Sequence, residues 1–569
     1  MSTLEEALAE HFGLVRFRGL QEPVIRHVLE GRNALAIMPT GEGKSLCYQL
    51  PAMLTEGTTI VVSPLIALME DQVRGLQRRG LPAACIHSQK ERREREAALD
   101  AASRGEIKLL YVTPERFRVG SFLQRAQSLR PPLLAVDEAH CVSQWGHDFR
   151  PDYGRLGEVR QALGAPPCLA LTATATPDVQ RDIRAALGIG DAEMFHAGIE
   201  RPNLCLSVHE VTSAEQKIDR ASEVIERVGG PGVIYCALIR ELLRLEGELQ
   251  RRGFEPLIYH GELSSRERRD QQAKFEASED GVILATNAFG MGVDKPDIRF
   301  LLHWQVPGTL DSYYQEIGRA GRDGAPSLCE LLYFEEDVSV QRDFTEWANP
   351  EVAFVTQIAE HLAAEGERIQ AIDVQMLRET FLLKNRRDGR IETCLNLLET
   401  AGCTKGELGR NFEWVRTPSA DEIRTWIPDG KRERDLRRLL AMVQYARAER
   451  CRRHAVHEYF GFDGPDGCGA CDLCLDVATW LDAQLPAAAR RPVPRRQGPK
   501  NPPEAAAEET APPVLRGDWI EVRGHGPCHV TRVHSGRGKR IKVDVEVARD
   551  LRTRSFDLSR VKWRRVEGD

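Results

Sequence analysis

Short runs of hydrophobic residues alternate with longer amphipathic segments through the first part of the chain. Five runs lie before residue 206, at residues 34–38, 59–64, 108–112, 133–138 and 168–175. Each run is bounded by glycine, proline or charged residues, a pattern typical of strands buried in a parallel sheet between helices. The pattern predicts an α/β domain over residues 1–205.

A second set of hydrophobic runs predicts another α/β domain over residues 206–345. These runs lie at residues 233–236, 256–261, 282–287 and 300–304. Two consecutive α/β units of similar size indicate two stacked domains with a cleft between them. The two stretches share an architecture, although their sequences do not repeat each other.

The pattern changes four times in the rest of the chain. Residues 346–425 are predicted to be helical; within them a helix-like segment and a strand-like one fit a winged helix, but also a buried helix hairpin. Residues 426–485 form a cysteine-bearing helical segment. The Pro-rich, polar residues 486–513 predict a disordered linker, and the short alternating strands of residues 514–569 predict an SH3-like β-barrel.

The composition is that of a soluble protein, with 42% hydrophobic and 29% charged residues. No hydrophobic run approaches the roughly 20 residues that a membrane span needs, and the N-terminal residues lack a secretory pattern. We therefore expect a cytoplasmic protein that contacts no membrane. Most of the 14 cysteines stand singly among apolar residues, so Cys236 and Cys329 are expected to be small buried hydrophobic residues.

The net charge of −7 is unevenly distributed along the chain. From Arg490 to the end there are 19 Lys and Arg residues against 11 Asp and Glu residues, a balance of +8, which leaves −15 for the rest. Binding to nucleic acid depends on local patches of charge, so the net charge does not exclude such a partner.

The segment Met38–Ser45, of sequence MPTGEGKS, joins a predicted strand to a predicted helix. This is the context of a phosphate-binding loop, in which Gly41 and Gly43 let backbone N–H groups face the phosphates. Lys44 would hold the β and γ phosphate oxygens, and the Ser45 hydroxyl would help to hold Mg²⁺. Taken alone, the segment would also fit a tight structural turn.

A carboxylate pair and an arginine pair turn this loop into a candidate ATP hydrolysis site. Asp137 and Glu138 end a buried strand, where Asp137 could bind Mg²⁺ through water and Glu138 could polarise the attacking water. Arg319 and Arg322 stand three residues apart, so a helix there would present both on one face to the developing charge of phosphoryl transfer. Together the motifs predict an ATPase.

Residues 14–334 resemble the RecQ family of superfamily 2 DNA helicases. The motifs MPTGEGKS, SPLIALMEDQV, DEAH, LTATAT and YYQEIGRAGRDG follow one another in the order of that family. The resemblance implies two tandem RecA-like α/β domains that close on ATP. It also implies a helicase that couples ATP hydrolysis to 3′–5′ movement along single-stranded DNA and to unwinding of forked duplexes in DNA repair and recombination. It also implies association with a bacterial-type nucleoid. The residues that it assigns to ATP binding are Arg18, Gln21, Thr40, Gly41, Gly43, Lys44, Ser45 and Gln315.

The segment 143–153, of sequence SQWGHDFRPDY, directly follows the DEAH motif. In the RecQ family this aromatic-rich loop binds single-stranded DNA and couples it to hydrolysis. Aromatic faces stack on bases whatever the sequence, and an adjacent arginine binds phosphate. A core role for the aromatic residues would be the alternative. The expected DNA contacts are Ser63, Pro64, Thr113, Trp145, His147, Phe149, Arg150, Thr286 and Asn287.

Four cysteines, Cys451, Cys468, Cys471 and Cys474, have the spacing C-x16-C-x2-C-x2-C. Four thiolates with two Cys-x2-Cys steps fit a structural, tetrahedral Zn²⁺ site. A redox CxxC motif or incidental cysteines are the alternatives. The spacing resembles the RecQ zinc subdomain, and the nearby His454 and His457 are expected on a solvated helix face.

Two features depart from the familiar RecQ arrangement. About 100 residues separate the motor from Cys451, and neither the usual winged helix nor the helical C-terminal module of such proteins follows the zinc site. The C-terminal barrel would serve either as an additional DNA contact or as a docking module for a protein partner. Two rival functions are an RNA helicase of the same superfamily and a DNA-binding scaffold with an inactive motor.

Overall fold

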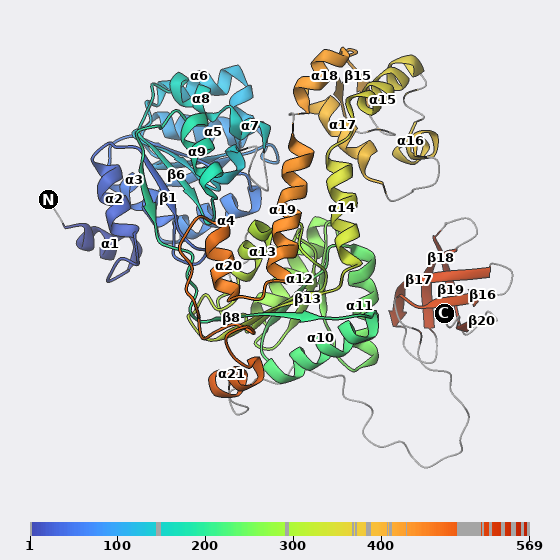
Figure 1. Ribbon diagram of the computed structural model, residues 1–569. Coiled ribbons are helices and arrows are strands. Elements are labelled where there is room, and N and C mark those ends of the chain that lie inside the picture. The colour runs from blue at the N-terminus through green and yellow to red at the C-terminus, as the bar shows by residue number, and fades with distance from the viewer. Residues whose placement is uncertain are drawn as a thin grey trace.

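Two parallel sheets, one above the other, form the body of the protein in the computed structural model (Figure 1). The structure describes residues 3–143, 150–290, 295–366, 369, 372–382, 388–406, 408, 412–427, 430–485, 514, 517–522, 526–535, 541–547, 553–558 and 563–565. The predicted linker therefore lies outside the described residues.

The first sheet has seven strands in the order β3-β4-β2-β5-β6-β1-β7, and all of its pairs are parallel. Its strands are β1 (Ala34–Ile37), β2 (Thr59–Val62), β3 (Ala83–Ile86), β4 (Leu109–Val112), β5 (Leu134–Val136), β6 (Cys168–Thr172) and β7 (Glu193–His196). Five of these were predicted; β3 and β7 were not.

Helices cover both faces of this sheet, because alternate residues of each strand point to opposite sides. On β1, Leu35 and Ile37 belong to one hydrophobic core, and Ala34 and Ala36 belong to the other. The helices are α1 (Leu4–Phe12), α2 (Gln21–Leu29), α3 (Leu46–Leu54), α4 (Ile66–Arg78), α5 (Arg92–Ser103), η1 (Pro114–Arg118), α6 (Gly120–Ser128), η2 (Ala139–Val142), α7 (Pro151–Gly154), α8 (Leu156–Ala162) and α9 (Pro177–Ala186).

The second sheet has six strands in the order β10-β11-β9-β12-β13-β8, again with parallel pairs. Its strands are β8 (Leu204–Glu210), β9 (Gly232–Tyr235), β10 (Leu257–Tyr259), β11 (Val282–Ala285), β12 (Phe300–His303) and β13 (Ser327–Tyr333), and its helices are α10 (Ala214–Val228), α11 (Ile239–Arg251), α12 (Ser265–Ala277) and α13 (Leu310–Ile317). The predicted pair of RecA-like α/β domains is confirmed. Sequence patterns missed β8 and β13.

Two long helices, α14 (Asp337–Ala348) and α19 (Lys431–Ala446), run side by side away from the second domain (Figure 1). Asn349 Nδ2 donates to Asp435 at 2.9 Å, and Arg432 binds Glu346, so polar contacts join the pair. We call α14 and α19 the stalk. Between them the chain forms a separate small module with its own hydrophobic core.

The module at the end of the stalk has the helix and hairpin of a winged helix. It contains α15 (Val352–Glu365), α16 (Val374–Phe381), α17 (Arg390–Thr400), β14 (Thr404–Lys405), β15 (Glu413–Trp414) and α18 (Ala420–Trp426). The strands β14 and β15 pair antiparallel directly after α17. The module therefore combines helices with a short antiparallel hairpin, as the winged-helix prediction requires.

The chain then returns to the second domain, where α20 (Arg452–Tyr459) and α21 (Val477–Gln484) pack on it.

A five-stranded antiparallel sheet ends the chain, in the order β19-β18-β17-β16-β20. Its strands are β16 (Trp519–Val522), β17 (Gly526–Ser535), β18 (Ile541–Val547), β19 (Thr553–Asp557) and β20 (Trp563–Arg565). Among the described residues, no helix is long and apolar enough to cross a membrane.

Candidate functional site

The phosphate-binding loop lies between β1 and α3, at the carboxyl edge of the first sheet. Gly41 and Gly43 adopt φ values of +89° and +75°, which side chains with a Cβ rarely adopt. A Cβ on Gly43 would also lie 2.7 Å from Gln21 Nε2. Lys44 Nζ donates to the Met38 carbonyl at 3.1 Å, so the ammonium lies inside the curve of the loop.

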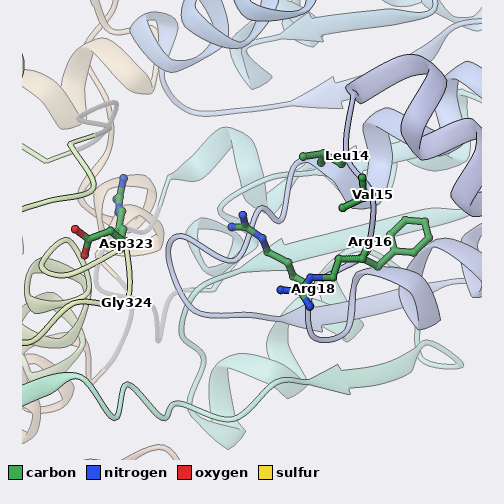
Figure 2. Close-up of a pocket in the computed structure, with 8 residues that line it drawn as sticks. Leu14, Val15, Arg16, Arg18, Asp323 and Gly324 are labelled. Carbon is green, nitrogen blue, oxygen red and sulfur yellow. The ribbon is translucent and has the colours of Figure 1, made fainter.

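Gln21 connects this loop to the segment that precedes α2. Its side chain is buried; Nε2 donates to the carbonyls of Glu42 at 2.8 Å and Gly43 at 3.1 Å, and Oε1 accepts from the Arg18 backbone at 2.9 Å. Arg18 lines a cavity of about 680 Å³ beside the loop, together with residues of the second domain (Figure 2). The cavity is lined by Leu14, Val15, Arg16, Phe17, Arg18, Arg322, Asp323 and Gly324.

Asp137 and Glu138 follow β5 at the same edge of the sheet. Burial, aided by the charge of Glu138, raises the pKa of Asp137 to about 7, while Lys44 acts in the opposite direction. Glu138 has a φ of +49° and lies 3.3 Å from His140 Nδ1. The two carboxyl groups offer the oxygen ligands that a divalent cation such as Mg²⁺ prefers.

Arg319 and Arg322 lie in the turns that follow α13, not on a helix. The predicted helical face is therefore wrong, because α13 ends at Ile317 and Gly321 adopts a φ of +54°, outside the helical range. Both arginines nevertheless reach the cleft. Arg319 donates to the Gly290 carbonyl, and the Arg322 side chain packs against Gly41, with Cγ 3.2 Å from the position of a Cβ there.

The two domains touch at the phosphate-binding loop. Thr40 Oγ1 donates to the Gly318 carbonyl at 2.7 Å, and Gln315 Nε2 contacts Thr174 Oγ1 at 3.4 Å. A cleft of about 870 Å³ lies at this junction. Of the predicted residues it is lined by Thr40, Gly41, Gly43, Lys44, Ser45, Pro64, Asp137, Glu138, Arg150, Asn287, Gln315, Arg319 and Arg322. The structure thus brings most of the predicted nucleotide residues of both domains into one cavity, while Arg18 lines the neighbouring cavity and Gln21 is held against the loop backbone.

The predicted DNA contacts occupy different positions relative to this cleft. Arg150 Nη1 donates to the Pro64 carbonyl at 3.0 Å, so the two form one wall. Ser63, Thr113 and Thr286 follow β2, β4 and β11 and are buried. Residues 144–149 of the aromatic-rich loop, which include Trp145, His147 and Phe149, lie outside the described residues.

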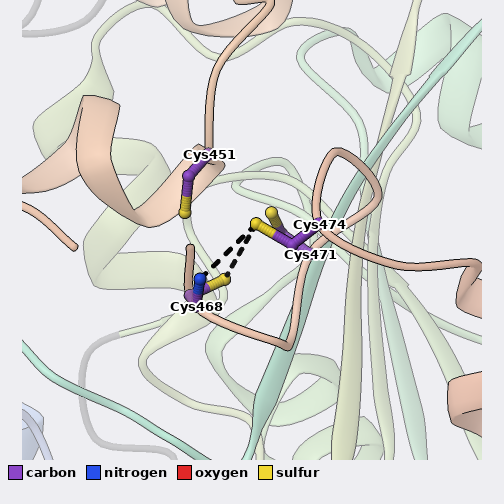
Figure 3. Close-up of side chains that lie close together, drawn as sticks. All are labelled: Cys451, Cys468, Cys471 and Cys474. Carbon is purple, nitrogen blue, oxygen red and sulfur yellow. Dashed lines mark hydrogen bonds between the residues drawn. The ribbon is translucent and has the colours of Figure 1, made fainter. Parts of the chain in front are cut away.

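The four predicted zinc ligands converge beside the second domain (Figure 3). Their Sγ atoms all lie within 4.8 Å of one another. Backbone N–H groups of Arg452 and Cys468 donate to Cys471 Sγ and Cys474 Sγ, each at 3.4 Å. A hydrogen bond from the Cys468 thiol lowers the pKa of Cys471 to about 5. The set fits Zn²⁺, which binds thiolates tetrahedrally.

The cysteine segment pairs with β8, the last strand of the second sheet. Leu206 of β8 donates to the Ala470 carbonyl at 3.1 Å and accepts from the Asp472 backbone at 3.0 Å. His454 and His457 stand outside the cysteine cluster and contact the carbonyls of Pro465 and Asp463. The prediction of a solvated face is wrong for His457, which is buried against that loop.

Comparison with known proteins matches three families in chain order. Residues 18–183 match the DEAD/DEAH box helicase, residues 216–324 the helicase conserved C-terminal domain and residues 420–475 the RecQ zinc-binding family. The ATP-dependent DNA helicase RecQ of Synechocystis sp. is 37% identical over 494 residues, which cover 83% of this chain and 98% of the relative. RecQ of Bacillus subtilis is 37% identical over 475 residues, covering 83% and 67% of the two chains.

The chain belongs to the RecQ family of ATP-dependent DNA helicases.

The residues of the cleft and of the cysteine cluster fit the chemistry of the RecQ family. A RecQ helicase hydrolyses ATP with Mg²⁺ and binds DNA, and the cleft offers a phosphate-binding loop, paired carboxyl groups and arginines from the facing domain. The four-cysteine cluster fits the structural Zn²⁺ of the RecQ zinc-binding family.

The sequence did not predict three functional candidates in this RecQ chain. His140, within the DEAH motif, has Nδ1 2.9 Å from Thr172 Oγ1 and 3.3 Å from Glu138, so it links the carboxyl group to the end of β6. Arg201 and Asn203 lie between the domains and bind carbonyls around Arg319. The DEAH motif pointed to His140, whereas no local pattern marks Arg201 or Asn203.

Proposed function

We propose that this RecQ helicase moves 3′–5′ along single-stranded DNA and unwinds forked duplexes during DNA repair and recombination, on nucleoid DNA in the cytoplasm. The observation that carries the proposal is the contact between Thr40 of one domain and Gly318 of the other. It supports a nucleotide site shared by both domains, in which binding and hydrolysis would open and close the cleft. Repeated closure on a bound strand would produce movement.

The predicted catalytic residues of the cleft receive roles on this proposal. Lys44 would bind the β and γ phosphates, and Ser45 with Asp137 would hold Mg²⁺, which when bound neutralises charge on the phosphate oxygens. Glu138 would orient and deprotonate the attacking water. Arg319 and Arg322 would stabilise the charge that develops during phosphoryl transfer.

The base of ATP would lie in the cavity beside the loop. Arg18 lines it, and Gln21 is held against the loop backbone by two hydrogen bonds, which supports a link between base recognition and phosphate binding. Leu14 and Val15 are exposed in the same cavity and would contact the base.

The DNA strand would run along the wall formed by Pro64 and Arg150, across both domains to Asn287. Trp145, His147 and Phe149 would stack on its bases. Ser63, Thr113 and Thr286 are buried in this structure and would contact its backbone when the cleft opens. We assign residues 1–205 and 206–345 to the motor, 346–425 to the stalk-borne module, 426–485 to the zinc subdomain, 486–513 to the linker and 514–569 to the barrel.

We also propose that the C-terminal sheet adds a DNA contact beside the motor. Asp518, which is buried, binds Arg251 of α11, and Arg532 lies 3.6 Å from Glu267 of α12, so the sheet packs on the second domain. Residues 514–569 hold 14 Lys and Arg against 8 Asp and Glu residues. This surplus suits phosphate, with docking of a protein partner as the alternative.

Two assays test the proposed function. ATP hydrolysis is measured with no nucleic acid, with single-stranded DNA and with RNA; the proposal expects strong stimulation by DNA alone. Unwinding is then measured on duplexes with a 3′ or a 5′ single-stranded tail. Unwinding that requires the 3′ tail supports the polarity, and equal or greater stimulation by RNA would favour an RNA helicase.

A further inference from the structure

The short segment between the two motor domains, residues 197–203, binds the loop that follows α13. We call it the interdomain linker, as distinct from the predicted linker of residues 486–513. The Arg201 guanidinium donates to three backbone carbonyls of this loop: Gly318 at 3.0 Å, Ala320 at 2.6 Å and Gly321 at 3.0 Å. These carbonyls lie on both sides of Arg319 and directly before Arg322. We call residues 318–325 the arginine loop.

Asn203 strengthens the same attachment. Its Nδ2 donates to the carbonyls of Gly321 and Ala325, each at 2.9 Å. A Cβ on Gly321 would lie only 2.4 Å from that nitrogen, so the loop packs closely on the interdomain linker. The arginine loop consists of turns, so side chains of the interdomain linker satisfy carbonyls that a helix would have bonded internally.

The zinc subdomain fixes the interdomain linker from its other side. Arg453, on the first turn of α20, is buried, and its Nη2 donates to the carbonyls of Arg201 at 2.8 Å, Pro202 at 3.2 Å and Leu204 at 2.8 Å. On the motor side, the Tyr314 hydroxyl donates to the Ile199 carbonyl. The backbone of Arg201 is therefore bound at a fixed position between α13 and α20.

We propose that Arg201 is a positioning residue for ATP hydrolysis, held in place by Arg453 of the zinc subdomain. The inference rests on the roles proposed above for Arg319 and Arg322. Charge-assisted hydrogen bonds from one planar guanidinium fix both the distance and the orientation of the arginine loop. Since the Gly318 carbonyl also accepts from Thr40, the same loop position sets its contact with the phosphate-binding loop.

Displacing a catalytic group by about 1 Å can reduce turnover about 10²-fold. We therefore expect Arg201→Ala to lower the kcat of DNA-stimulated hydrolysis by about 10- to 100-fold, with the KM for ATP changed less than about twofold. Affinity for ADP with aluminium fluoride should fall by a similar factor, while affinity for ADP alone stays unchanged. Arg201→Lys, which keeps the charge but offers no planar fork, should restore only part of the loss.

Arg160 provides a matched control in the first domain. It is a buried arginine whose guanidinium binds the carbonyls of Pro166 and Gly188, and it is not among the described residues that line the cleft. Arg160→Ala should lower the melting temperature about as much as Arg201→Ala and leave kcat near the wild-type value. Arg453→Ala should lower kcat in the same direction as Arg201→Ala, and zinc content is measured for every variant to show that the subdomain is intact.

A mutant cycle with the arginine loop decides the outcome. If Arg201 acts by placing the arginine loop, adding Arg201→Ala to a chain that already carries Arg319→Ala and Arg322→Ala should lower kcat by less than about twofold further. A full additional loss of 10-fold or more, or a loss of kcat in Arg160→Ala equal to that in Arg201→Ala, would overturn the proposal. If Arg319→Ala and Arg322→Ala both kept wild-type kcat, the roles of these arginines would themselves be refuted, and the positioning role with them.

Discussion

The zinc centre and the nucleotide cleft are assembled from very different lengths of chain. All four zinc ligands come from residues 451–474, and backbone N–H groups of the same segment donate to their sulfurs. The cleft instead joins Thr40 in one domain to Arg322 in the other. A structural zinc site needs four protein ligands, and a short segment can supply all of them. A motor instead needs a site divided between two domains that move relative to each other.

Two substitutions in the cleft should separate the loss of ATP binding from the loss of turnover. Lys44→Ala should abolish hydrolysis and weaken ATP binding, because the ammonium inside the loop no longer binds phosphate. Glu138→Gln should keep ATP binding but lower turnover by roughly 10²- to 10⁴-fold, since an amide cannot accept the proton of water. Equilibrium binding of ATP and DNA-stimulated hydrolysis check both. Appreciable turnover in the Glu138 variant would exclude its role as base.

Loss of one zinc ligand should unfold the zinc subdomain. Elemental analysis should give one zinc per chain, and Cys471→Ser should make the protein poorly soluble, because losing a ligand removes binding energy that folds the subdomain. Cys236→Ala is the matched control: this cysteine is buried in the second domain away from the cluster, so its loss should leave zinc content unchanged. A soluble, zinc-free Cys471 variant with full activity would contradict the prediction.

These two sites also differ in how far the sequence predicts them. The cysteine spacing specified all four ligands, because a local segment sets their distances. The phosphate-binding loop and the carboxyl pair could be predicted as separate motifs, since each follows a recognisable strand. Arg319 and Arg322 were predicted to join this site, although on a helix that does not extend to them. The contacts of Arg201 depend on how the two domains pack, which no local pattern encodes.

The same reasoning applies to the fold. Parallel strands with continuous hydrophobic runs, such as β1 and β2, were predicted, whereas β7 carries exposed and half-buried residues and left no clear signal. The helix expected around Arg319 does not form, because glycines in that segment adopt backbone angles outside the helical region. The C-terminal sheet docks on α11 through a buried carboxylate, Asp518. Composition could not reveal its partner, Arg251, because that arginine lies in another domain.

A smaller effect is expected at the junction of cleft and DNA. Trp145→Ala should leave ATP binding and basal hydrolysis intact while reducing DNA stimulation, because each stacked base contributes about 1–3 kcal/mol of binding. Hydrolysis is measured over a range of DNA concentrations. If basal and stimulated rates fell together, Trp145 would be a core residue.

The smallest effect should come from the C-terminal region. A chain ending at Leu485 keeps α21 and should retain the maximal DNA-stimulated rate, since the removed sheet binds α11 and α12 outside the cleft. The DNA concentration for half-stimulation should rise. The salt dependence of binding should become shallower by about 0.7 in log–log slope for each phosphate that the shortened chain no longer neutralises.

Asp518→Asn serves as the companion variant for this truncation. It removes the charge that binds Arg251 while keeping every basic residue of the tail. An intermediate salt slope would indicate that docking orients the basic surface. An unchanged slope in the truncated chain would favour a protein-docking module, and a lost maximal rate would show that the sheet supports the motor.

The most direct test of the motor is the rate of ATP hydrolysis by the intact chain with and without single-stranded DNA, compared with the same measurement on Arg322→Ala. A cleft completed by the second domain predicts strong stimulation by DNA in the wild type and its loss in the variant, with ATP still bound. Equal DNA-stimulated rates in the two proteins would contradict a hydrolytic site shared between the domains.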